Sequence, residues 1–140
     1  MPTLYSDKCT QTAGSIIPAK SDLGLVTTIG TYTMPASGVA SSDVIQMVKV
    51  PAGATIVDIT FCGNGGMAST STTSVGDGAS TARYMATKTT QAAFIYRLDV
   101  GAGGAYTYTS EDTIDLLLAS FSGITAGSVI KLIVTYTTNP

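Results

Sequence analysis

The chain has 140 residues, with 7 basic and 9 acidic side chains, a formal net charge of -2 at pH 7 and no histidine. This length fits a single domain, since most domains contain roughly 100–150 residues. The few basic residues are scattered, so nucleic acid is not an expected partner. No apolar run approaches the roughly 18 residues of a membrane helix, and no imidazole is available for catalysis or metal binding. Composition therefore argues against nucleic-acid binding, membrane insertion and histidine-dependent enzymes.

Residues 1–23 follow neither the helical nor the strand period, and we interpret them as an extended N-terminal arm. We expect apolar residues of the arm to cover an open strand edge or to contact another subunit. These residues are Leu4, Tyr5, Ile16, Ile17 and Pro18. The arm does not begin with a basic segment followed by a hydrophobic stretch, so the sequence gives no indication of export.

The two cysteines are Cys9, in the arm, and Cys62. They can pair only if the arm folds back beside the segment around Cys62. Because the sequence shows no export signal, we expect free thiols in preference to a disulfide.

From residue 24 to residue 140 the pattern changes to short alternating runs, separated by turns rich in glycine and proline. Alternate side chains of a strand point to opposite faces, so each run presents one apolar face. The clearest runs are 54–62, 93–100, 112–119 and 128–137. Their apolar sets are Val57, Ile59 and Phe61; Phe94, Tyr96, Leu98 and Val100; Ile114, Leu116 and Leu118; and Ile130, Leu132, Val134 and Tyr136.

Weaker strands are expected at 25–34, 43–50, 71–76, 82–88 and 104–109, where Thr, Val and Tyr dominate. Eight or nine short strands without a helix of normal length are typical of a β-sandwich. The sequence therefore predicts an all-β, jelly-roll-like antiparallel β-sandwich over residues 24–140, preceded by the arm.

Two motifs suggest ligands, but each has a simpler structural interpretation. Residues 63–68 (GNGGMA) fit a dinucleotide-binding fingerprint in spacing, but no helix former follows them, so a turn is favoured. Calcium binding by Asp77, Asp112 and Asp115 is conceivable, but their spacing matches no known calcium loop. We favour Asp77 as a turn residue and expect neither a metal nor a cofactor.

Tyr106 and Tyr108 fall on one face of a short predicted strand. They can form a platform for stacking a sugar, or they can belong to the core. We favour the core, because neighbouring strands also present aromatic residues to a buried face.

Four segments together resemble small virion proteins of tailed phages. They are residues 50–59 (VPAGATIVDI), 74–78 (SVGDG), 82–85 (ARYM) and 106–114 (YTYTSEDTI). The resemblance covers residues 25–138 and is to capsid cement, or decoration, proteins of the kind found on a Bordetella phage. It implies a jelly-roll domain bound as symmetric oligomers to the outer face of the capsid. It brings no catalytic residues.

The resulting hypothesis is a non-enzymatic structural protein, made in the host cytoplasm, that binds the outer capsid surface. Its expected partners are the major capsid protein and further copies of itself, with a dimer favoured over a trimer. The alternative is a fibre-like or lectin-like module that binds a host glycan or receptor.

Overall fold

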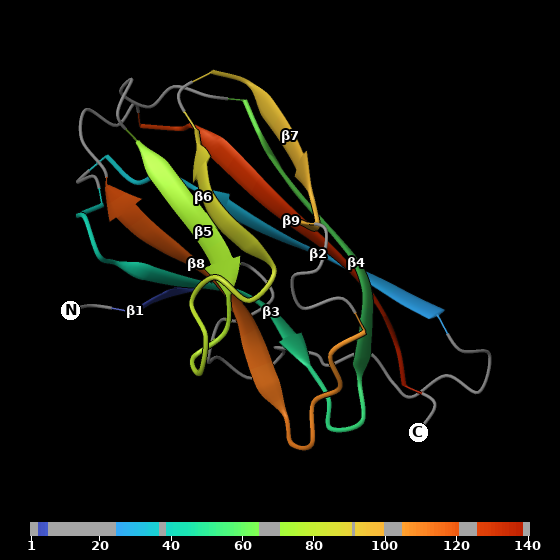
Figure 1. Ribbon diagram of the computed structural model, residues 1–140. Coiled ribbons are helices and arrows are strands. Elements are labelled where there is room, and N and C mark those ends of the chain that lie inside the picture. The colour runs from blue at the N-terminus through green and yellow to red at the C-terminus, as the bar shows by residue number, and fades with distance from the viewer. Residues whose placement is uncertain are drawn as a thin grey trace.

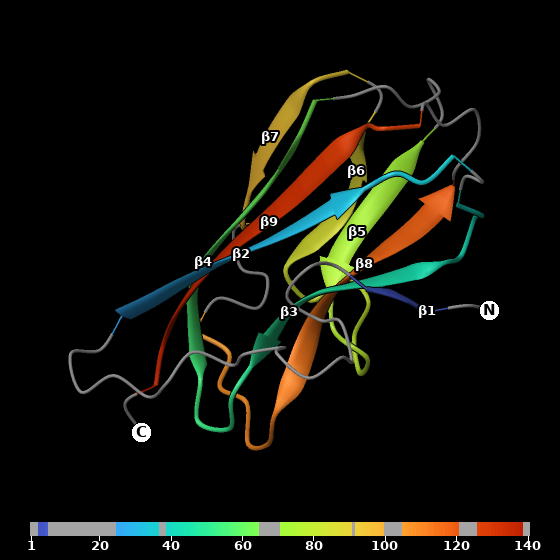
Figure 2. The same cartoon turned by 180° about the vertical axis from the view of Figure 1, so that it is seen from behind.

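Two β-sheets pack face to face around one apolar core (Figures 1 and 2). The structure, a computed structural model, describes residues 3–5, 25–36, 39–64, 71–90, 92–99, 105–120 and 126–138. The five-stranded sheet has the order β1 (Thr3–Tyr5), β3 (Val44–Val50), β8 (Asp112–Ser120), β5 (Thr72–Gly76) and β6 (Met85–Thr89). The four-stranded sheet has the order β2 (Leu25–Thr33), β9 (Val129–Thr137), β4 (Thr55–Gly63) and β7 (Phe94–Arg97). Neighbouring strands are antiparallel, except for β1 and β3.

The core includes the apolar sets that the alternation predicts for β8 and β9. Ile114, Leu116 and Leu118 of β8 are fully buried, as are the four predicted residues of β9. Phe94 and Tyr96 of β7 are half-buried and pack against the core. The predicted all-β, jelly-roll-like sandwich is confirmed, and the described residues contain no helix that could span a membrane.

The prediction for β4 is wrong at one residue, Val57. Ile56, Ile59 and Phe61 are fully buried, whereas Val57 is 48% exposed. The pairing between β4 and β9 shifts register between Ile56 and Asp58, because Val57 forms a β-bulge. A bulge inserts one extra residue, so the inward side chain before it is Ile56 and not Val57.

The predicted strand at 104–109 is also wrong. Among its described residues, 105–109, a single bridge joins Thr107 to Thr55, although backbone hydrogen bonds tie the segment to the start of β4. Ala105 has a φ of 60°, a conformation that interrupts a regular strand.

Only a short part of the predicted arm is described. Residues Thr3–Tyr5 form β1, a strand that the sequence pattern does not indicate, and Leu4 is half-buried against the core. Ile16, Ile17, Pro18 and Cys9 lie outside the described residues, as does the side chain of Tyr5. Residues 65–68 of the glycine-rich motif also lie outside them.

A close approach between β2 and β3 links the two sheets at Gly30. A Cβ at this position would overlap the backbone carbonyl oxygen of Met47. Gly30 is paired with Leu132 at the centre of the β2–β9 ladder. A residue without a side chain is therefore required where the two layers meet.

Candidate interaction surface

The outer face of the four-stranded sheet carries all the large apolar side chains that are strongly exposed among the described residues. Leu25 and Ile29 lie on β2, Val57 on β4 and Ile95 on β7, with exposed fractions of 45–74%. Single exposed apolar residues are ordinary, but four on one sheet face mark a candidate contact surface.

The strand register arranges this face in rows that cross the sheet. One row joins Ile29 of β2, Ile133 of β9, Thr60 of β4 and Arg97 of β7. The next outward row, two residues along each strand, joins Thr31, Lys131, Cys62 and Ile95. Apolar, threonine and single charged side chains therefore alternate over a continuous surface.

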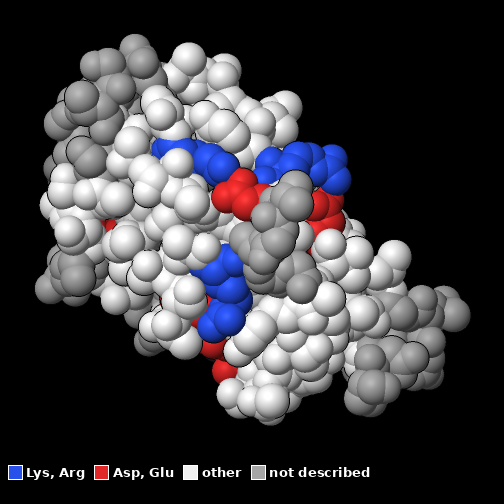
Figure 3. Space-filling model, viewed as in Figure 1, with Lys and Arg blue, Asp and Glu red and all other residues white. Residues whose placement is uncertain are grey.

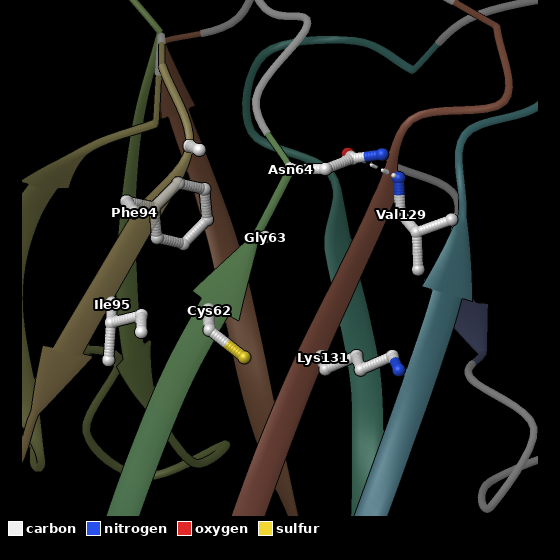
Figure 4. Close-up of a pocket in the computed structure, with 8 residues that line it drawn as sticks. Cys62, Gly63, Asn64, Phe94, Ile95, Val129 and Lys131 are labelled. Carbon is white, nitrogen blue, oxygen red and sulfur yellow. Dashed lines mark hydrogen bonds between the residues drawn. The ribbon is translucent and has the colours of Figure 1, made fainter.

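One end of the face is hollowed, with a volume of about 830 Å³. Figure 4 shows Ile95, Cys62 and Lys131 side by side on β7, β4 and β9 along this hollow. Asn64 fixes the adjoining end of β4, because its Oδ1 accepts a hydrogen bond from the backbone N–H of Val129 at 3.0 Å. Cys62 has a free thiol in the structure.

The basic side chains elsewhere on the described surface mostly face carboxylates. Lys88 binds Asp99 at 2.6 Å, and Arg97 binds Asp58. Figure 3 shows basic and acidic side chains next to one another in a narrow band, with most of that view uncharged. Lys131 has no carboxylate partner among the described residues. The outer face of the four-stranded sheet thus carries a cation that is available to a partner.

A second polar site is buried where the β5–β6 loop meets residues 105–110. Asp77, only 2% exposed, accepts hydrogen bonds from the backbone N–H groups of Ala79 and Ser80. It also binds Arg83 Nε at 2.6 Å and accepts from the Tyr108 hydroxyl at 2.9 Å. Tyr108 has only one proton to donate, so the Tyr84 hydroxyl, 2.7 Å away, donates to Tyr108.

The ionisation of these groups follows from burial and pairing. Burial alone would raise the pKa of Asp77, but hydrogen bonds from Arg83, Ser80 and Tyr108 hold that pKa below its ordinary value. Burial raises the pKa of both Tyr84 and Tyr108, so the two hydroxyls stay neutral. The guanidinium of Arg83 also lies 3.9 Å from the centre of the Tyr106 ring.

These contacts decide between the alternatives for the tyrosines and the acidic residues. Tyr108 is a core residue, as predicted, and a buried ring is not available to stack a sugar. Asp77 is a turn residue, as predicted, and its oxygens are occupied by donors. Among the described residues, no three Asp, Glu, Cys or His side chains are grouped closely enough to hold a metal ion.

The outer face of the four-stranded sheet was not among the surfaces predicted from the sequence. The available signal is an apolar residue in the outward phase of a strand, as at Ile95 between Phe94 and Tyr96. Of the five arm residues predicted to make contacts, Leu4 alone has a described side chain.

Comparisons with solved structures identify the same fold in phage capsids. A chain in the capsid of Ralstonia phage GP4 superposes with a TM-score of 0.79 at 16% identity, over 99% of both chains. A chain in the cyanophage Pam1 capsid asymmetric unit gives 0.70 at 20% identity, over 94% of this chain and 99% of that one. A chain in the acidic stable capsid structure of Helicobacter pylori bacteriophage KHP30 gives 0.54 at 18% identity, over 81% and 86%.

The chain has the fold of phage capsid chains. No protein-family model matches the sequence, and no curated protein sequence matches it. The likeness to these capsid chains is therefore one of fold.

Replacing Tyr108 with Phe tests the buried polar site. The change removes one hydroxyl, which leaves the buried Tyr84 hydroxyl without its partner and Asp77 with one donor fewer, so we expect a loss of about 1–3 kcal/mol in the free energy of unfolding. Tyr106→Phe is the control, because it keeps the ring beside Arg83, and we expect it to cost less than about 0.5 kcal/mol. Urea unfolding measures both. Equal losses of stability in the two variants would contradict the role of the Tyr108 hydroxyl in the buried polar site.

Proposed function

We propose that this protein is a decoration, or cement, protein of a tailed phage. It binds the outer surface of the capsid and stabilises contacts between capsomers of the major capsid protein. It acts as a structural component and not as an enzyme. The observation that supports this most is the likeness, over nearly the whole chain, to chains within two phage capsids.

The lengths of the matched chains indicate what kind of capsid component this protein is similar to. The matched chains in the Ralstonia phage GP4 and cyanophage Pam1 capsids are each covered over 99% of their length, so each is about as long as this chain. A small sandwich of this kind is present in those capsids as a chain of its own. This favours an accessory subunit that attaches to a larger shell.

The outer face of the four-stranded sheet is the surface that we assign to the shell. Three nine-residue strands and the four-residue β7, spaced by ordinary sheet distances, give a face of roughly 500 Å². A standard protein interface buries roughly 800 Å² on each partner, so this face supplies most of one. Its exposed isoleucines give apolar contact, and Lys131 selects a shell surface with a carboxylate opposite it.

The N-terminal arm supplies the remaining contact in this proposal. β1 already pairs with β3 at the edge of the five-stranded sheet, and Leu4 packs against the core. We propose that Leu4, Tyr5, Ile16, Ile17 and Pro18 cover an edge or bridge to a second copy or to the shell. A dimer is the oligomer that we favour, because two-fold contacts are the commonest in soluble homo-oligomers.

The fibre-like or lectin-like alternative gains no support from the tyrosines. A glycan site of the predicted kind needs exposed aromatic rings, but Tyr108 is buried and Tyr106 lies against Arg83. That alternative is therefore an outcome of the following experiment and not a second proposal.

The copy number in purified virions tests the proposed function. We expect quantitative mass spectrometry to give a ratio to the major capsid protein near one, or a simple fraction of it, because a decoration protein occupies repeated positions. A handful of copies per particle would instead support a receptor-binding module at a vertex or tail. A protein absent from the virion would overturn the proposal.

Placing a charge on the assigned face tests where the shell binds. We expect Ile95→Lys to weaken attachment at least about tenfold when the variant is added to particles that lack the protein, because burying an unpaired ammonium is costly. Ile95 is 74% exposed, so the fold should be unaffected. Thr87→Lys, on exposed β6, is the matched control and should bind as wild type. If Thr87→Lys lost binding and Ile95→Lys did not, the shell would contact the five-stranded sheet and the assigned face would be wrong.

Deletion of residues 1–20 tests the arm. We expect the deleted protein to lose its oligomeric state or its occupancy on the capsid, measured by light scattering and by mass spectrometry of reconstituted particles. If occupancy and oligomeric state both stayed unchanged, the role assigned to the arm would be wrong.

A further inference from the structure

A small cavity of about 120 Å³ lies between β8 and the loop that joins β5 to β6. Its lining includes Asp115 and Leu117 from β8, Val44 from β3, and Asp77, Gly78 and Thr81 from the loop. Figure 1 shows this yellow-green loop in front of the five-stranded sheet. The cavity is separate from the surface assigned to the shell, which lies on the other sheet.

The loop is held down on the sheet by backbone contacts. The Ser74 hydroxyl donates to the Thr81 carbonyl at 3.0 Å, and the Asp77 N–H donates to the Ser80 carbonyl at 2.9 Å. Gly76 lies directly beneath the backbone of Ser80 and Thr81, where a Cβ would not fit. The loop therefore covers the outward face of the sheet at this point.

Asp115 is buried by this cover. It alternates with Ile114 and Leu116 along β8, so its side chain points away from the sandwich core, yet it is only 9% exposed. Its Oδ1 is buried and has no hydrogen-bond partner in the part of the chain that the structure describes. A buried carboxylate oxygen without a donor is costly when it is ionised and much less so when the carboxyl is protonated.

No cationic group among the described residues forms an ion pair with Asp115. Burial, together with the nearby charges of Asp112 and Asp77, raises the pKa of Asp115 to about 7, although a hydrogen bond from Thr113 lowers it. The basic residues of the neighbouring elements do not pair with Asp115. Arg83 binds Asp77, and Lys88 of β6 binds Asp99. Lys49 of β3 lies opposite Thr113, diagonally across from Asp115, and makes no ion pair with it.

A proton fits this cavity better than a metal ion does. Asp77 already accepts from two backbone N–H groups, Arg83 and Tyr108, which occupy its lone pairs. A divalent cation such as Ca²⁺ needs six to eight oxygen ligands, and Asp115 offers one free oxygen. A single proton is enough to neutralise Asp115.

We propose that Asp115 is a proton-controlled latch: the protonated carboxyl lets the 77–83 loop close over β8, and the ionised carboxylate loosens the loop. The direction of the pH dependence follows from the linkage between proton binding and loop closure. A carboxyl with a pKa raised by closure binds more protons in the closed state than in the open one, so closure weakens as the pH rises through the range between the two pKa values. The weakening begins near the ordinary pKa of Asp and levels off above about pH 7.

Hydrogen exchange of the loop amides tests the latch in the intact protein. The ratio of the wild-type rate to the Asp115→Asn rate at each pH removes the intrinsic pH dependence of exchange. We expect this ratio to rise at least roughly tenfold for residues 77–83 between about pH 5 and pH 8, and to stay constant for β9. Glu111→Gln, which neutralises an exposed carboxylate near the start of β8, should behave as wild type.

Three results would overturn the latch. One is a ratio that does not change with pH, and another is a Glu111→Gln effect equal to that of Asp115→Asn. The third is full recovery of loop protection at pH 8 on adding millimolar calcium, which would make the cavity a metal site. If the Asn variant failed to fold, carbon-13 NMR of the wild-type carboxyl would decide, because titration of Asp115 below about pH 5 excludes the latch.

Discussion

The pairing of β9 with β2 on one side and β4 on the other is the constraint on which the rest of the structure depends. It fixes which side chains of three long strands face the core, because a slip of one residue would exchange the two faces. Leu132, Val134 and Tyr136 are thereby buried, and Lys131 and Ile133 are placed on the outer face. The bulge at Val57 is the point where β4 departs from simple alternation, and it adds one more apolar side chain to that outer face.

The outer faces of the two sheets differ, and the proposed shell-binding surface and the Asp115 cavity lie on different sheets. The outer face of the four-stranded sheet keeps exposed apolar residues and a cation without a partner in the described part of the chain. The outer face of the five-stranded sheet is covered near Asp115 by the 77–83 loop, which is tied to the core through Asp77, Tyr108 and Tyr84. A surface covered by the chain itself can become a site for internal regulation. A surface left open is suited to a partner.

Sequence alone was sufficient for the elements whose alternation is clean, such as β8 and β9, and for Asp77 as a turn residue. It failed at Val57, because a bulge depends on how β4 meets β9 and leaves no mark in the local pattern. It failed at 104–109, where Ala105 has a positive φ and the segment joins the start of β4 by backbone hydrogen bonds and a single bridge. The sequence could not predict that Asp115 and Asp77 line one cavity. The loop and the strand that carry them are some 40 positions apart in the sequence and are brought together only by the fold.

The fold is shared with phage capsid chains at no more than 20% identity, and the core explains how this is possible. A sandwich requires apolar residues in the inward phase of its strands and small residues where layers meet, and many sequences satisfy both. Folding places few requirements on the side chains that point outward from the sheets. Exposed residues such as Ile29 and Ile95 contribute little to the core and expose apolar area to water, so the fold does not account for them. Contact with another surface does account for them, and in this chain that contact is best sought on the outward phase of β2, β9, β4 and β7.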